Sequence, residues 1–177
     1  PIWQYDVGAL FIPSNTDKPL IEGCDSYVAY VVLVMGNHEM RAMEFSTGEI
    51  KWKKPVSQAI YRVFPEEDNL YFLENKPDGI YLWALDAQDG GTKWTALLSR
   101  SYTGVHVTVT ERYVIAVINR YMRGYQSRIM VFQKSNGQKM KDYEVNEGNR
   151  GRTYTEVMIS GKNLWAVKDN VTWVMGK

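Results

Sequence analysis

Residues 84–94 read Ala-Leu-Asp-Ala-Gln-Asp-Gly-Gly-Thr-Lys-Trp, and residues 42–52 read Ala-Met-Glu-Phe-Ser-Thr-Gly-Glu-Ile-Lys-Trp. The two stretches lie 42 residues apart and share an alanine, an acidic residue two positions later, a glycine six positions later and a tryptophan ten positions later. A repeat of about 40–50 residues built from short strands is typical of a β-propeller. The spacing therefore predicts an all-β chain whose repeated unit is a propeller blade.

The residues around the second copy fit one blade of four antiparallel strands. Apolar or alternating runs bounded by turn residues predict strands at residues 59–64, 70–73 and 80–86. A fourth strand is expected after the turn at residues 89–91, ending near Trp94. A turn is expected at residues 65–69 and a loop at residues 74–79, and Gly90 supplies the positive φ of the last tight turn. No stretch shows the periodicity and caps of a helix.

The same plan predicts about four units, at residues 18–52, 57–94, 104–143, and 154–177 together with 1–5. The third unit keeps the glycine as Gly137, but Lys141 stands where the tryptophan is expected, and Tyr143 is the candidate to replace it in packing. Trp3 takes the tryptophan role in the last strand of the fourth unit. Two architectures stay open: a closed ring of four blades, or a segment of a larger propeller that other blades or a second copy complete.

Composition sets further bounds on the chain. Of its 177 residues only Cys24 is a cysteine, so no internal disulfide forms, and no apolar run approaches the roughly 20 residues of a membrane-spanning helix. The net charge is +1, which argues against a dedicated nucleic-acid binder. Residues 1–88 nevertheless hold seven basic and thirteen acidic side chains, whereas residues 89–177 hold fourteen and seven. Such asymmetry can mark an interaction surface.

The motif at residues 84–94 resembles the quinoprotein-like (PQQ-like) β-propeller repeat, Ala-Leu-Asp-Ala-x-Thr-Gly-x-x-x-Trp. The matching residues are Ala84, Leu85, Asp86, Ala87, Gly90 and Trp94, and in the first copy Ala42, Thr47, Gly48 and Trp52. The resemblance implies that the tryptophan docks one blade onto the next and that the small alanine leaves room for a neighbouring indole. The motif residues expected to dock blades are Trp3, Ala42, Gly48, Trp52, Ala84, Gly90, Trp94 and Gly137.

The family includes quinone-dependent dehydrogenases. The resemblance implies that a site of that type needs eight blades, a calcium ion and a disulfide between neighbouring cysteines. One cysteine and about four blades cannot assemble that site alone, so no cofactor and no catalytic residue is expected. A fragment of such a dehydrogenase stays an alternative. The family also includes non-catalytic scaffolds of bacterial envelope assembly and sensor domains of secretory compartments, which makes an extracytoplasmic setting the better expectation.

Other reactive side chains show no functional spacing. His38 and His106 have no partner at a metal-ligand spacing, so no metal site is expected. Cys24 is placed in a turn beside an aspartate, which disfavours the thiolate. The acidic motif residues Glu44 and Asp86, and also Asp89, fall where carboxylates bond backbone N–H groups of turns.

The strongest functional feature is a basic and aromatic rim predicted in the third unit. The candidate partner-binding residues are Arg120, Tyr121, Arg123, Tyr125, Arg128, Arg150 and Arg152. The loop between second and third strands of a blade and the connection to the next blade emerge on one face, so these residues are expected to gather. Guanidinium groups suit carboxylates or phosphates. The sequence thus predicts a non-enzymatic scaffold or protein-interaction module; the alternatives are a polyanion binder, self-association, or a solvated face whose charges pair within the chain.

Overall fold

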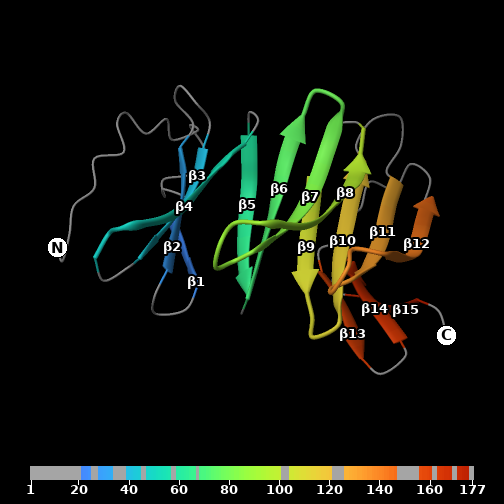
Figure 1. The fold of residues 1–177 in the computed structure, drawn as a ribbon. Helices are drawn as coiled ribbons and strands as arrows, with labels where there is room; N and C mark the ends of the chain where they lie inside the picture. The colour runs from blue at the N-terminus through green and yellow to red at the C-terminus, as the bar shows by residue number, and fades with distance from the viewer. Residues whose placement is uncertain are drawn as a thin grey trace. The chain divides into compact units, whose positions relative to one another are not determined.

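The described residues form β-strands and contain no helix (Figure 1). The computed structural model describes residues 21–24, 28–33, 39–44, 47–56, 59–66, 68–100, 104–120, 126–146, 156–160, 163–168 and 171–175, and it places side chains at 39–44, 47–56, 63–66, 68–100, 104–119 and 127–144. The chain divides into two compact units, Pro1–Leu97 and Leu98–Lys177. Each unit is described by itself.

The first unit holds two antiparallel sheets, each of four strands in sequence order. The first sheet consists of β1 (Ile21–Cys24), β2 (Val28–Leu33), β3 (Glu39–Glu44) and β4 (Ile50–Pro55). The second consists of β5 (Ala59–Glu66), β6 (Asn69–Lys76), β7 (Gly79–Asp86) and β8 (Thr92–Ser99), which ends just beyond the unit boundary. Four consecutive antiparallel strands are the blade of a propeller.

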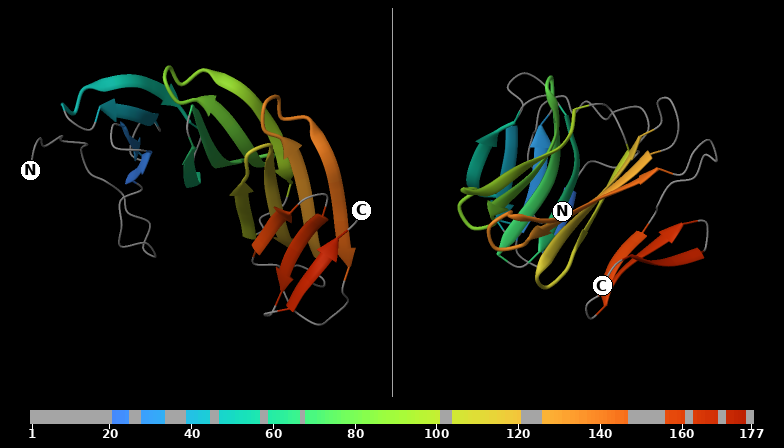
Figure 2. Two further views of the ribbon diagram at one scale, coloured as in Figure 1. Left: turned by 90° about the horizontal axis from the view of Figure 1, so that it is seen from below. Right: turned by 90° about the vertical axis from the view of Figure 1, so that its right-hand side faces the viewer.

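The second unit holds one sheet of four strands and one of three. The four-stranded sheet consists of β9 (Gly104–Val109), β10 (Tyr113–Arg120), β11 (Gln126–Gln133) and β12 (Lys139–Asn146). The other consists of β13 (Glu156–Ser160), β14 (Asn163–Lys168) and β15 (Val171–Met175). The strands of each sheet are twisted, because the chirality of L-amino acids favours a twisted strand (Figure 2). The predicted strand from Ile2 to Tyr5 lies outside the described residues, so ring closure stays a prediction.

The prediction of an all-β chain is confirmed, and three of the four predicted units are antiparallel sheets of four strands. Several local details were wrong. Residues 74–79 are not a loop, because β6 and β7 continue to a two-residue turn at Pro77 and Asp78. Cys24 lies in β1, paired with Val28, rather than in a turn. The last strand of the second sheet runs five residues past Trp94 to Ser99.

The core of the first unit lies between its two sheets. Alternate residues of a strand face one side of the sheet, and here the facing sets are apolar. The buried cluster consists of Met40, Ala42 and Trp52 from the first sheet and Val63, Leu70, Phe72 and Leu85 from the second, with Val56 and Trp83 packed against it. Burial of this apolar surface, which contributes about 25 cal/mol per Å², therefore stabilises the packing of one sheet against the other.

Candidate functional site

The hairpin after the third strand of each four-stranded sheet has the same backbone geometry. Gly48, Gly90 and Gly137 have φ of 75°, 73° and 70°. Each donates its N–H to the carbonyl four residues earlier, at 2.8, 3.0 and 2.9 Å. A side chain at such a φ is strained, so these positions favour glycine. The glycine spacing of the sequence thus reflects one type of turn, which occurs in all three hairpins.

The acidic residue of the motif is part of this turn in the first two copies. Glu44 pairs with Lys51 at 3.2 Å, and Asp86 pairs with Lys93 at 3.0 Å. Asp86 also accepts a hydrogen bond from the N–H of Gln88, which, together with Lys93, lowers the pKa of this carboxyl. Both carboxylates therefore stabilise a hairpin. Asp89 likewise accepts a 2.7 Å hydrogen bond, from the N–H of Gly91.

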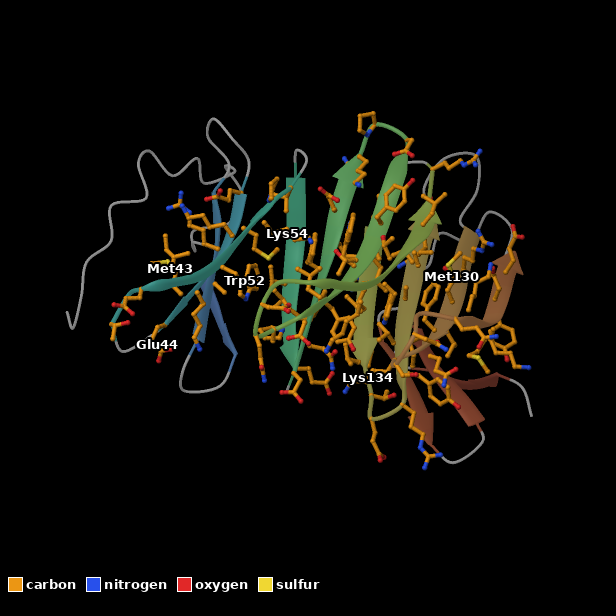
Figure 3. The ribbon with its side chains drawn as sticks, viewed as in Figure 1. Met43, Glu44, Trp52, Lys54, Met130 and Lys134 are labelled. Atoms are coloured by element: carbon orange, nitrogen blue, oxygen red, sulfur yellow. The ribbon has the colours of Figure 1, made fainter. Side chains whose placement is uncertain are left out.

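Trp52 connects the first sheet to the hairpin of the second. Its indole Nε1 donates a buried 3.0 Å hydrogen bond to the carbonyl oxygen of Ala87. Its ring lies so close to Gly90 that a Cβ there would come within 2.8 Å of two ring carbons. Lys54, two residues further along β4, donates to the Gly90 carbonyl and the Thr92 hydroxyl at 3.3 and 2.9 Å. Figure 3 shows Trp52 and Lys54 on the side of β4 toward the second sheet. We propose that Trp52 docks the two blades.

The other residues expected to dock blades are described in part. Ala42 and Ala84 are fully buried, as a position that accommodates an indole requires. Trp94 is buried, and its ring centre lies 5.9 Å from that of Tyr71. Trp3 lies outside the described residues. The docking role of these residues stays a proposal.

Most of the predicted basic rim falls outside what the structure describes. Tyr121, Arg123, Tyr125, Arg150 and Arg152 lie outside the described residues, and the structure places only the backbone of Arg120, at the end of β10. Whether these residues gather on one face stays a prediction.

Arg128 lies within β11 and holds Asp142 of β12. Its Nε and Nη2 donate to the two carboxylate oxygens at 2.6 and 2.7 Å, and Lys139 donates to the same carboxylate at 2.6 Å. The bidentate geometry orients the guanidinium along the sheet surface. Arg128 is therefore engaged within its own sheet, and its part in a partner-binding rim stays a prediction.

Replacing Asp142 by asparagine is expected to lower the free energy of unfolding at neutral pH but not at acid pH. Arg128 first, and then Lys139, lower the pKa of this carboxyl from its ordinary value of 3.8. A carboxyl with a depressed folded-state pKa adds stability above its unfolded value and loses it as pH falls through the folded value. For this half-exposed pair we expect about 0.2–1 kcal/mol at neutral pH. Urea unfolding of both proteins from neutral pH down to the acid range measures the difference, and a constant difference at every pH would contradict this account.

The described side chains contain no group of three His, Cys, Asp or Glu residues that could hold a metal ion. His106 lies in β9, paired with Val117. His38 lies outside the described residues. No helix in the described part of the chain is long and apolar enough to cross a membrane.

Sequence reasoning missed one cluster of charged and aromatic side chains on the second sheet. The Nζ atoms of Lys54 and Lys76 lie 5.7 and 4.7 Å from the centre of the Trp83 ring, and Lys76 also lies over Tyr81. The alternation of residues 72, 74 and 76 along one strand was a usable signal, since such residues share a face. The approach of Lys54 from another sheet had no local signal.

Comparisons with known proteins agree with this architecture. The model of the family described as outer membrane protein assembly factor BamB matches residues 2–173. Among solved structures, BamB from Moraxella catarrhalis is 16% identical with a TM-score of 0.55, covering 81% of this chain and 44% of that one. Quinohemoprotein alcohol dehydrogenase from Comamonas testosteroni is 18% identical with a TM-score of 0.50, covering 71% and 22%. A search of curated proteins finds no match.

The chain spans less than half the length of either solved protein. At these identities the structures show the fold alone, which is that of a β-propeller or a segment of one. The predicted PQQ-like repeat resemblance is confirmed, because the family match covers nearly the whole chain. The chain belongs to the PQQ-like β-propeller family described as outer membrane protein assembly factor BamB.

Proposed function

We propose that this chain is a non-enzymatic propeller module that binds another protein. The observation that carries the proposal is the family match over residues 2–173, whose description names an assembly factor. Scaffolds of this kind present loops at the ends of their strands, and their partners usually meet such loops. An extracytoplasmic setting fits a family named for outer membrane protein assembly.

The basic rim is the surface proposed to meet the partner. Residues 121–125 of the rim connect β10 to β11, whereas the turn at Asn136 joins β11 to β12 at the other end of β11. A photo-crosslinking amino acid at Tyr121 or Tyr125, placed in the full natural protein, should therefore capture a defined protein partner. The same amino acid at Asn136 is the matched control.

The partner so identified allows a direct measurement of affinity. Replacing Arg120, Arg123, Arg150 and Arg152 by glutamate is expected to weaken binding at least tenfold, because each charge reversal places like charges opposite an acidic surface. The control is Arg112→Glu, in the exposed turn between β9 and β10. Equal affinity of the fourfold variant, or equal crosslinking from Asn136, would remove the rim from the proposal. Capture of nucleic acid with a steep salt dependence would favour the polyanion alternative.

A dehydrogenase fragment is the second candidate, and the similarity to quinohemoprotein alcohol dehydrogenase favours it. This candidate requires a quinone and calcium, and the described side chains offer no cluster of three metal-binding groups. If it holds, pyrroloquinoline quinone with calcium should change the tryptophan fluorescence of the complete natural protein saturably. A response equal to that with calcium alone would exclude it.

A further inference from the structure

The ammonium group of Lys76 lies against two aromatic rings and a buried carboxylate of its own sheet. Its Nζ is 4.7 Å from the centre of the Trp83 ring, 5.1 Å from that of Tyr81 and 3.5 Å from Oε2 of Glu74. A cation within about 6 Å of an aromatic ring centre is attracted by the ring quadrupole. Aromatic rings and a carboxylate around one position are the groups with which proteins bind ammonium ions.

Strand register assembles this set. Phe72, Glu74 and Lys76 share one face of β6, and their partners on β7 are Trp83, Tyr81 and Gly79. Phe72 stacks on the Trp83 ring at 5.8 Å with an interplanar angle of 3°. Because Gly79 has no side chain, the stem of Lys76 has room to lean across β7 toward the two rings.

Further contacts and burial hold the rings and the acid in place. The hydroxyl of Tyr81 donates a 2.6 Å hydrogen bond to Asp78, which fixes that ring. The side chain of Glu74 is 4% exposed, whereas that of Lys76 is 31% exposed. A buried carboxylate is costly without a cation nearby. The acid is therefore a fixed part of the sheet, and the lysine reaches it from the solvent side.

We propose that Glu74, Tyr81 and Trp83 form a binding site for an alkylammonium or guanidinium group, which Lys76 fills in the free chain. A lysine or arginine side chain of a protein ligand enters the site by displacing Lys76, whose partly exposed side chain can swing into solvent without opening the sheet. The inference goes beyond the proposed role of the basic rim and does not depend on it, because it concerns another sheet and the opposite charge.

Methylammonium chloride added to the Lys76→Ala chain tests the site directly. The readout is the indole N–H signal of Trp83 in a ¹⁵N correlation spectrum, assigned by its loss in Trp83→Phe, with sodium chloride at equal ionic strength as reference. Removing Lys76 removes the competing internal cation, so the apparent Kd is expected to be at least about tenfold lower than in the unaltered chain. A shift that never saturates, or one that sodium chloride reproduces, would overturn the proposal.

Lys54→Ala is the matched control. Lys54 also lies over Trp83, but its ammonium bonds Gly90 and Thr92 rather than Glu74. Its removal should leave methylammonium affinity unchanged, and an equal gain would show that the indole signal reports any lost cation. Lys76→Met keeps the apolar stem and serves if the alanine variant does not fold. Adding Glu74→Gln to the open variant should abolish saturable binding, and retained binding would contradict the role of the acid.

Discussion

Trp52→Ala is expected to lower the free energy of unfolding by about 3–5 kcal/mol, the range seen when a buried tryptophan is truncated. Trp52 is only 8% exposed and lies in the cluster that joins the two sheets of the first unit. Its loss leaves a cavity over Gly90 and deprives the Ala87 carbonyl of a buried hydrogen bond. Urea unfolding followed by circular dichroism measures the difference.

Two variants separate the packing of Trp52 from its hydrogen bond. Trp52→Phe keeps an aromatic ring but loses the N–H, so its cost should fall between zero and that of the alanine variant. Lys53→Ala changes the neighbouring exposed residue of β4 and should stay within about 0.5 kcal/mol of the unaltered chain. A cost below about 1 kcal/mol for Trp52→Ala would show that Trp52 does not dock the sheets.

The sequence motif predicted the turn geometry because that geometry is local. A positive φ confines the position to glycine, and the cross-strand pairs Glu44–Lys51 and Asp86–Lys93 span a few residues of one hairpin. The tryptophan role could be inferred only through resemblance. Its contacts with Ala87 and Gly90 join positions 35 or more residues apart, and nothing in a local pattern specifies them.

Features that depend on strand register escaped prediction. Residues 74–79 contain Glu, Asn, Lys, Pro, Asp and Gly, which resemble a loop, yet hydrogen bonds to β5 and β7 keep most of them in strands. The same register places Arg128 of β11 opposite residues of β12, where it pairs with Asp142. The order of residues alone does not contain this ion pair.

The third hairpin shows that the motif residues act together. Where the first two hairpins have an acid paired with a lysine, the third has Gln133 and Met140, and Met140 is 46% exposed. Lys141, at the tryptophan position, is also exposed, while Tyr143 is half-buried. The backbone turn is nevertheless retained, with Gly137 at a φ of 70°. The glycine thus fixes the hairpin, and the ion pair and the tryptophan are separable additions to it.

Gly90→Ala is expected to cost about 2–5 kcal/mol, from two separate causes. Positive φ costs a residue with a Cβ about 1–2 kcal/mol, and overpacking against a fixed neighbour costs about 1–3 kcal/mol more. Here φ is 73°, and the new methyl would lie 2.8 Å from two carbons of the buried Trp52 ring. The adjacent Gly91→Ala is the control, because its Cβ would meet only the end of the exposed Asp89 side chain, which can move away with the loss of one exposed hydrogen bond.

Combining Gly90→Ala with Trp52→Ala separates the two causes. Without the indole the steric overlap disappears and the strain of positive φ remains, so the double variant should be more stable than the sum of the single losses predicts, by about 1–3 kcal/mol. Urea unfolding of the four proteins closes the cycle. Additive losses would mean that Gly90 is needed for its backbone alone, and the close approach of Trp52 would then have no part in selecting glycine at this turn.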